Sequence, residues 1–218
     1  MLKLFLKLII AILSIPIGVG VTEAFYKNLT MVSALSGKLP FFLWGIAAYV
    51  VIHLLFYKPT YLYVLGHEAV HAGISWIFGG KIKSFKVSKA GGSVGTDKSN
   101  VVISLSPYFV PIYAIVIAVI YFVVASSYNI NGATFIFLIG FALAFHMIST
   151  IEVMKIRQPD IVKSGHFFSI VFVYVFNVIV VALIFSLMFP EFFMKKFFVD
   201  SWLLSKGAYV GAARQMFM

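Results

Sequence analysis

The sequence contains no cysteine and few charged residues, and both absences restrict what the chain can be. Without cysteine the 218-residue chain forms no disulfide and offers no thiolate, so only His, Asp or Glu side chains are left to bind a metal ion. Charged residues make up only 11% of the chain, while hydrophobic residues make up 62%. A soluble domain normally carries about 25% charged residues. We therefore expect an integral membrane protein.

Acidic residues are scarcer than basic ones. The chain has seven Asp and Glu against 17 Lys and Arg, which gives a formal net charge of +10. The basic residues lie mainly in short segments between apolar stretches, where they suit anionic lipid headgroups. No nucleic-acid-binding motif accompanies them. The predicted partner of the positive charge is the lipid bilayer and not a nucleic acid, and the sequence indicates no oligomeric state.

Apolar stretches long enough to cross a membrane occur along most of the chain. A helix needs about 20 apolar residues to cross about 30 Å of hydrocarbon. The first stretch follows Lys3 and Lys7 as in a signal peptide, but no small-x-small cleavage site closes it, so we expect it to be retained. The predicted fold is an all-α integral membrane protein of about six transmembrane helices. They cover residues 4–25, 41–57, 61–78, 101–126, 133–151 and 168–189.

These helices suggest three consecutive segments. Residues 1–58 would form two accessory transmembrane helices, and residues 59–190 the functional core. Residues 191–218 mix Phe, Trp and Leu with Lys, which is typical of an amphipathic helix at the membrane interface.

The segment 79–100 differs from its apolar neighbours. Phe85 and Val87 alternate with Lys86 and Ser88 at the period of a β-strand, and three glycines follow. The pattern predicts a short β-hairpin that turns within residues 89–92. A flexible basic loop at the headgroups is the alternative.

The distribution of Lys and Arg predicts an orientation. Alternating spans would place the loops at 27–40, 79–100 and 152–167 on one side, with ten of the 17 basic residues. The excess favours the cytoplasmic side for these loops. We expect the hairpin in the cytoplasm, the N-terminus outside, and the chain in the cytoplasmic membrane of a prokaryote.

The sequence His67-Glu68-Ala69-Val70-His71 lies inside the third apolar stretch. Residues four apart share one helical face, so His67 and His71 can bind one metal ion, while Glu68 can reach a metal-bound water. Zinc suits two imidazoles and one carboxylate, so we expect one Zn²⁺ per chain with Glu68 as the catalytic base. In the structural alternative these polar residues only bond neighbouring helices.

Asp160 is the best candidate for the third ligand. Pro159 precedes it and interrupts the helical register, so irregular backbone could present Asp160 to the metal. The alternative is an Asp that caps the sixth helix. His146 and His166 compete for the same role, and His146 would equally suit a position behind the ligands or beside the substrate.

These residues together resemble the site-2 protease family of intramembrane zinc metalloproteases. The resemblance rests on the His67 to His71 sequence in a membrane helix, the basic hairpin after it, and Gln158-Pro159-Asp160 near the start of a later helix, over about residues 60–190. In that family an Asp in an Asn-Pro-Asp-Gly or Leu-Asp-Gly pattern is the third ligand, which maps to Asp160. Here Gln158 replaces Asn and Ile161 replaces Gly.

The resemblance implies a hairpin that re-enters the membrane at about residues 81–96 and a site reached from the cytoplasm. The expected activity is hydrolysis of peptide bonds in or near transmembrane segments of membrane proteins. Phe85 and Val87 would hold an unwound substrate by strand pairing, and Gln158 or Asn177 would assist the oxyanion. Two rivals remain, namely an inactive relative that binds membrane helices and a metal-ion transporter.

Overall fold

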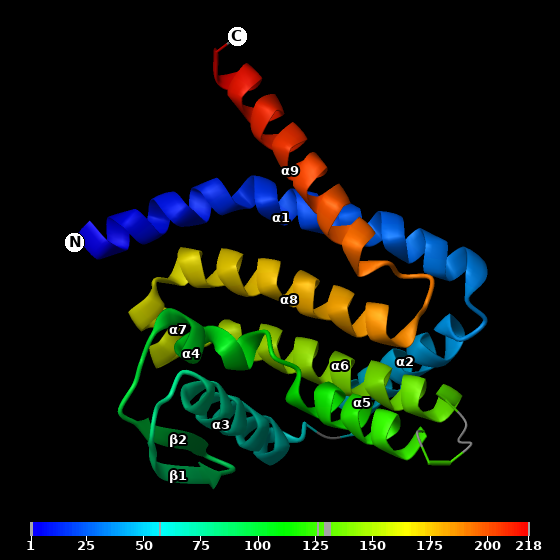
Figure 1. The fold of residues 1–218 in the computed structure, drawn as a ribbon. Helices are drawn as coiled ribbons and strands as arrows, with labels where there is room; N and C mark the ends of the chain where they lie inside the picture. Colours follow the sequence, from blue (N-terminus) through cyan, green and yellow to red (C-terminus); the bar gives the residue numbers. More distant parts are fainter. Residues whose placement is uncertain (1, 57, 126, 129–131, 218) are drawn as a thin grey trace. The chain divides into compact units, whose positions relative to one another are not determined.

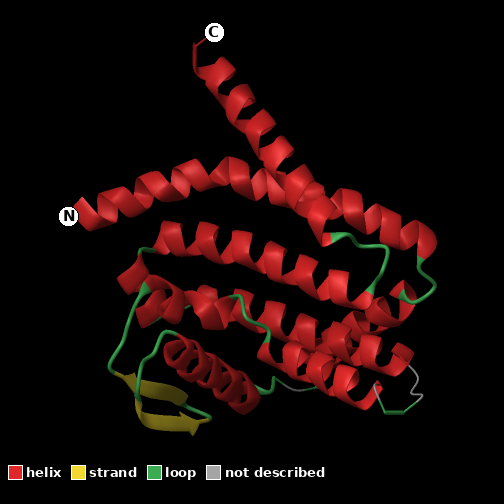
Figure 2. Cartoon of the chain, viewed as in Figure 1, coloured by secondary structure: helices red, strands yellow, loops and turns green. Residues whose placement is uncertain are grey.

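The computed structural model describes residues 2–56, 58–125, 127–128 and 132–217, and it is mainly helical (Figures 1 and 2). The ends of two predicted spans, Tyr57 and Ser126, lie outside the described residues. The elements are α1 Leu2–Leu35, α2 Leu39–Leu55, α3 Thr60–Ile77, β1 Ile82–Ser88, β2 Gly91–Thr96, α4 Val101–Leu105, the 3-10 helix η1 Ser106–Tyr108, α5 Ile112–Ala125, α6 Gly132–Met154, α7 Pro159–Ser164, α8 His166–Met188 and α9 Met194–Phe217.

The chain divides into two compact units. One unit consists of Met1–Gly37 and Val162–Met218, and therefore contains α1, α8 and α9. The other unit, Lys38–Ile161, contains α2 to α6 and the hairpin. Helix α1 thus belongs to one unit and α2 to the other, and the division into three segments stays a prediction.

Three described helices are long and apolar enough to cross a membrane: Leu4–Ala34 within α1, then α6 and α8. A fourth crossing arises if Val101–Tyr108 and Ile112–Ala125 form one span, which is bent by 77°. The predicted continuous helix at 101–126 is therefore broken. Pro107 and Pro111 flank the bend, and proline lacks the N–H that would continue a helix. Helix α2 is apolar but shorter, and α3 is not among the candidate spans of the described residues.

In the second unit, α2 and α6 pack closely and run in the same direction. A Cβ on Gly45 would lie 2.0 Å from the Phe137 carbonyl oxygen, so glycine is required at this crossing. Further along both helices, the rings of Tyr49 and Phe145 are in contact. Six alternating spans would make these helices the second and fifth and hence antiparallel. Their parallel packing departs from that expectation.

The first unit shows the same departure. Near the N-terminal end of α1, Lys7 lies over the Phe168 ring of α8, and about five turns further along both helices the rings of Phe25 and Phe185 are in contact. Helices α1 and α8 are therefore parallel, although six alternating spans would make them antiparallel. Helix α9 crosses α1 at Gly20, where a Cβ would lie 2.6 Å from the Ser205 backbone nitrogen. The predicted helix in the tail is present, and its place at the interface stays a prediction.

The predicted β-hairpin is confirmed. Strands β1 and β2 are antiparallel, with Phe85 opposite Val94 and Val87 opposite Gly92. Gly91 adopts a φ of 144° next to the turn, a conformation that side chains disfavour. At the open end of the hairpin, the Lys81 backbone N–H donates to Asp97 at 2.7 Å. Its entry into the membrane stays a prediction.

The parallel packing of α2 and α6 predicts that α3 begins and ends on one face of the membrane. Parallel spans need an odd number of crossings between them, and the bent α4 to α5 pair supplies one. Because the chain has no cysteine, single replacements Lys58→Cys and Lys89→Cys can be labelled with a membrane-impermeant maleimide. We expect both to react from the same face, and Lys38→Cys, before α2, to react from the other. Labelling of Lys58→Cys and Lys89→Cys from opposite faces would contradict this topology.

Candidate metal centre

Helix α3 places His67 and His71 on one face, one turn apart, with ring centroids 4.8 Å from each other. The helix is held close to the start of α5, because a Cβ on Gly66 would lie 2.8 Å from the Tyr113 ring. The Tyr113 hydroxyl also donates to the Leu62 carbonyl. Helix α3 brings both imidazoles to one point, as the four-residue spacing in the sequence predicts.

Asp160 reaches the same point from the start of α7. Its Oδ2 atom lies 3.3 Å from Nε2 of His71 and 3.8 Å from Nε2 of His67. One ligand atom from each of the three residues lies within 4.8 Å of the others. Two ligands on a tetrahedral zinc ion are separated by about 3.4 Å, given bond lengths of about 2.0–2.1 Å. The three side chains therefore fit a zinc ion with small adjustments.

The second nitrogen of each imidazole is also engaged. Nδ1 of His71 lies 2.9 Å from the Ile103 carbonyl oxygen, and Nδ1 of His67 lies 3.2 Å from the Tyr63 hydroxyl. Such contacts fix the ring orientation of metal-bound histidines and leave Nε2 for the metal. Asn100 supports this arrangement, since its side chain accepts from the Ile103 N–H at the start of α4.

The surroundings of His71 call for a positive charge. A carbonyl oxygen faces one ring nitrogen and a carboxylate oxygen faces the other, and neither oxygen can donate a hydrogen bond. A neutral imidazole carries only one N–H, so a proton or a metal cation must lie between His71 and Asp160. The donor set therefore fits a divalent cation on chemical grounds.

The electrostatics of Asp160 agree with this view. Burial raises the pKa of its carboxyl group. The hydrogen bonds from His67 and His71 lower the pKa by more than burial raises it, so the pKa lies well below the ordinary value. Asp160 is consequently an anion over the physiological pH range, as a metal ligand must be.

Glu68 lies beside the histidines and is covered by the hairpin. Only 7% of the residue is exposed. A Cβ on Gly92 of β2 would lie 2.6 Å from its Cγ atom and 2.9 Å from its Oε1 atom, so glycine permits this close approach. The hairpin therefore packs directly on the residue predicted to be the catalytic base.

The other predicted site residues are less closely gathered. His146 on α6 is buried and lines a cavity of about 20 Å³ with His67 and Tyr63, which is room for about one water. Gln158 is partly buried just before α7. Phe85 is 46% exposed on β1, and Val87 lies opposite Gly92.

Two predicted alternatives belong to the other unit. His166 begins α8, and Asn177 lies further along that helix, where its side chain donates to the Val173 carbonyl. The structure brings Asp160, rather than either of the competing histidines, to the ligand atoms of His67 and His71.

Sequence reasoning missed Tyr63, the Ile103 carbonyl and Gly92. Tyr63 stands one turn before His67, so helical spacing alone could have identified it as a neighbour of the ligand. The Ile103 carbonyl and Gly92 carry no comparable signal. Their roles arise from the packing of α4 and β2 on α3.

No known protein-family model matches the chain, and neither a curated protein nor a solved structure is significantly similar to it. The likeness to site-2 proteases therefore depends on the residues described above and not on any overall match.

Replacing Tyr63 tests whether its hydroxyl orients His67. We expect Tyr63→Phe to weaken zinc affinity about tenfold or more, because outer contacts to ligating histidines typically have effects of about 10- to 100-fold. Affinity would be measured by competition with a chelator on the purified protein. Tyr174→Phe is the matched control, since it removes a tyrosine hydroxyl whose contact with Thr22 lies in the other unit. Equal affinities of Tyr63→Phe and the wild type would contradict the role.

Proposed function

We propose that this protein is an intramembrane zinc metalloprotease of the site-2 protease type, which hydrolyses peptide bonds in or near transmembrane segments. The observation that carries the proposal is that His71 lies between the Ile103 carbonyl and the Asp160 carboxylate with a ligand atom of His67 within 4.8 Å, an arrangement that a metal cation would satisfy. With His67 as the third donor, the set leaves a fourth zinc position open for water. Glu68 lies next to this set.

The residues divide the chemistry among them. A bound zinc ion supplies a Lewis acid and lowers the pKa of water to about 7. Glu68 accepts a proton from the attacking water and later donates it to the leaving amine as the peptide C–N bond breaks. His67, His71 and Asp160 hold the ion, and the contacts from Tyr63 and Ile103 keep both rings in place.

The hairpin supports a substrate in extended conformation. A helical substrate hides its carbonyl groups in its own hydrogen bonds, so it must unwind before attack. A two-stranded hairpin has unpaired edges to which an unwound segment can add as a further strand. Because β2 packs on Glu68, a strand held by the hairpin lies near the catalytic base. Phe85 and Val87 would hold the substrate, and Gln158 would donate to the oxyanion.

The proposed setting is the cytoplasmic membrane of a prokaryote, with the site open toward the cytoplasm. The candidate spans support membrane association. The orientation rests on the basic residues of the hairpin and of the segment before α7.

Replacing Glu68 tests the reaction. We expect Glu68→Gln to retain one zinc per chain and to lower cleavage of transmembrane peptides in proteoliposomes at least about 100-fold, as the loss of a general base requires. Metal content and cleavage of a panel of fluorogenic transmembrane peptides would be measured together. Undiminished cleavage in Glu68→Gln would contradict the mechanism. Zinc flux into proteoliposomes without peptide cleavage would instead favour a metal-ion transporter. Binding of transmembrane helices with neither zinc flux nor cleavage would favour an inactive relative.

Replacing Phe85 and Val87 with proline tests the hairpin. Proline removes backbone N–H groups from β1 and interrupts strand pairing. We expect cleavage of transmembrane peptides to fall strongly in the double variant while zinc affinity stays unchanged. Full cleavage activity in this variant would refute strand addition at the hairpin.

A further inference from the structure

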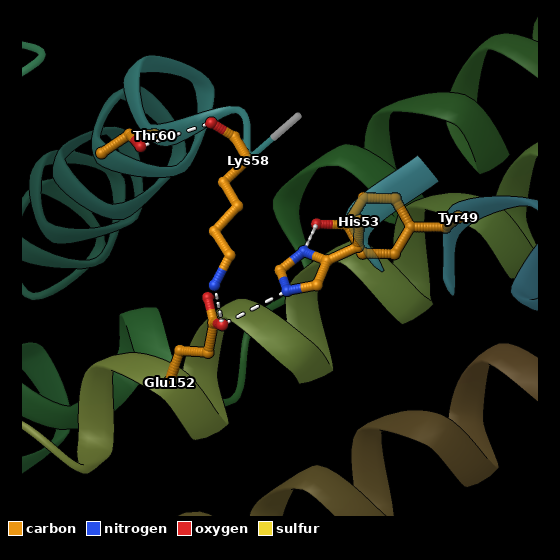
Figure 3. A network of polar contacts seen from close by, with 5 residues as sticks. All are labelled: Tyr49, His53, Lys58, Thr60 and Glu152. Carbon is orange, nitrogen blue, oxygen red and sulfur yellow. Dashed lines mark hydrogen bonds and ion pairs between the residues drawn. The ribbon is translucent and has the colours of Figure 1, made fainter. Parts of the chain in front are cut away.

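A second group of polar residues lies where α2, α3 and α6 meet (Figure 3). Oε1 of Glu152, near the end of α6, lies 3.2 Å from Nε2 of His53 and also pairs with Nζ of Lys58. The Tyr49 hydroxyl lies 3.1 Å from Nδ1 of His53. We call Tyr49, His53, Lys58 and Glu152 the Glu152 cluster.

The cluster lies next to the metal centre. Its four residues line a cavity of about 90 Å³ together with Tyr63, whose hydroxyl contacts the metal ligand His67. The His53 side chain is only 9% exposed, so this part of the cluster is largely enclosed.

The cluster also joins the two segments of chain that carry the ligands. Lys58 precedes α3 and stands nine residues before His67, while Glu152 stands eight residues before Asp160. Helix α3 otherwise packs mainly on the hairpin, α4 and η1, whereas α6 packs mainly on α2 and α5. The Lys58 to Glu152 ion pair is therefore a direct link between the start of α3 and the end of α6.

The start of α3 has no side-chain cap. The residue before it is Pro59, whose side chain cannot accept a hydrogen bond, and the first turn contains no acidic residue. A shift of this end relative to α6 would change the distance between the histidines and Asp160. Zinc binding is sensitive to such a change, because its ligand distances hold within about 0.2 Å.

We propose that Lys58, His53 and Glu152 are positioning residues that fix the start of α3 against the end of α6 and thereby set the geometry of the metal centre. The inference rests on the proposed metal site. The Lys58 and Glu152 side chains are 62% and 38% exposed, and ion pairs that are this exposed contribute little to overall stability. Loss of the pair should therefore weaken zinc binding and leave the thermal midpoint of the zinc-free protein unchanged.

Charge removal and charge exchange test the proposal on the full-length protein. We expect Lys58→Gln and Glu152→Gln each to weaken zinc affinity by up to about fivefold in chelator competition, because an exposed ion pair contributes about 1 kcal/mol or less. The double variant Lys58→Glu with Glu152→Lys should restore most of the affinity, because the pair is re-formed and His53 can accept a hydrogen bond from the new Lys. Lys196→Gln is the matched control, since it breaks an ion pair with Asp200 within α9.

The outcomes separate this inference from the proposed function. Unchanged affinity in both single variants, or no recovery in the exchanged variant, would overturn the positioning role while the metal site stands. A lower thermal midpoint of the zinc-free protein in both single variants would also overturn it, because the pair would then stabilise the fold as a whole. Absence of zinc binding in the wild type would instead refute the proposed function itself.

Discussion

The rest of the site depends on one constraint, which is that His71 is held between two oxygen acceptors in largely apolar surroundings. The Ile103 carbonyl fixes the proton on one ring nitrogen, and the Asp160 carboxylate faces the other. Buried charges are costly unless they are paired. A cation shared by His67, His71 and Asp160, as proposed, would remove this cost for all three residues at once.

The elements around α3 can be understood from this constraint. Helix α4 brings the Ile103 carbonyl to His71, and the bend between η1 and α5 allows α4 to lie there instead of continuing as a straight span. Helix α7 begins shortly after α6 ends, and its first turn places Asp160 beside the histidines. Ile161 stands where the resembling family has glycine, and it is 1% exposed. This departure therefore adds a buried side chain without keeping Asp160 from the histidines.

Local patterns in the sequence predicted the local parts of this arrangement. The four-residue spacing placed His67 and His71 on one face, and the alternation around Phe85 predicted the hairpin. The direction of the helices could not be predicted in the same way. The parallel packing of α2 on α6 depends on Gly45 and Gly140, whose contacts span about ninety residues of sequence. The Lys58 to Glu152 link, the Ile103 carbonyl and the close approach of Gly92 to Glu68 likewise arise only from tertiary packing.

The most direct test of the account is X-ray absorption spectroscopy at the zinc edge of the purified protein loaded with one equivalent of zinc. The account predicts a four-coordinate ion with nitrogen and oxygen ligands at about 2.0–2.1 Å and the outer-shell scattering of two imidazoles. His71→Ala should lose one of those imidazoles. A six-coordinate oxygen shell without imidazole scattering, or a protein that retains no zinc, would contradict it.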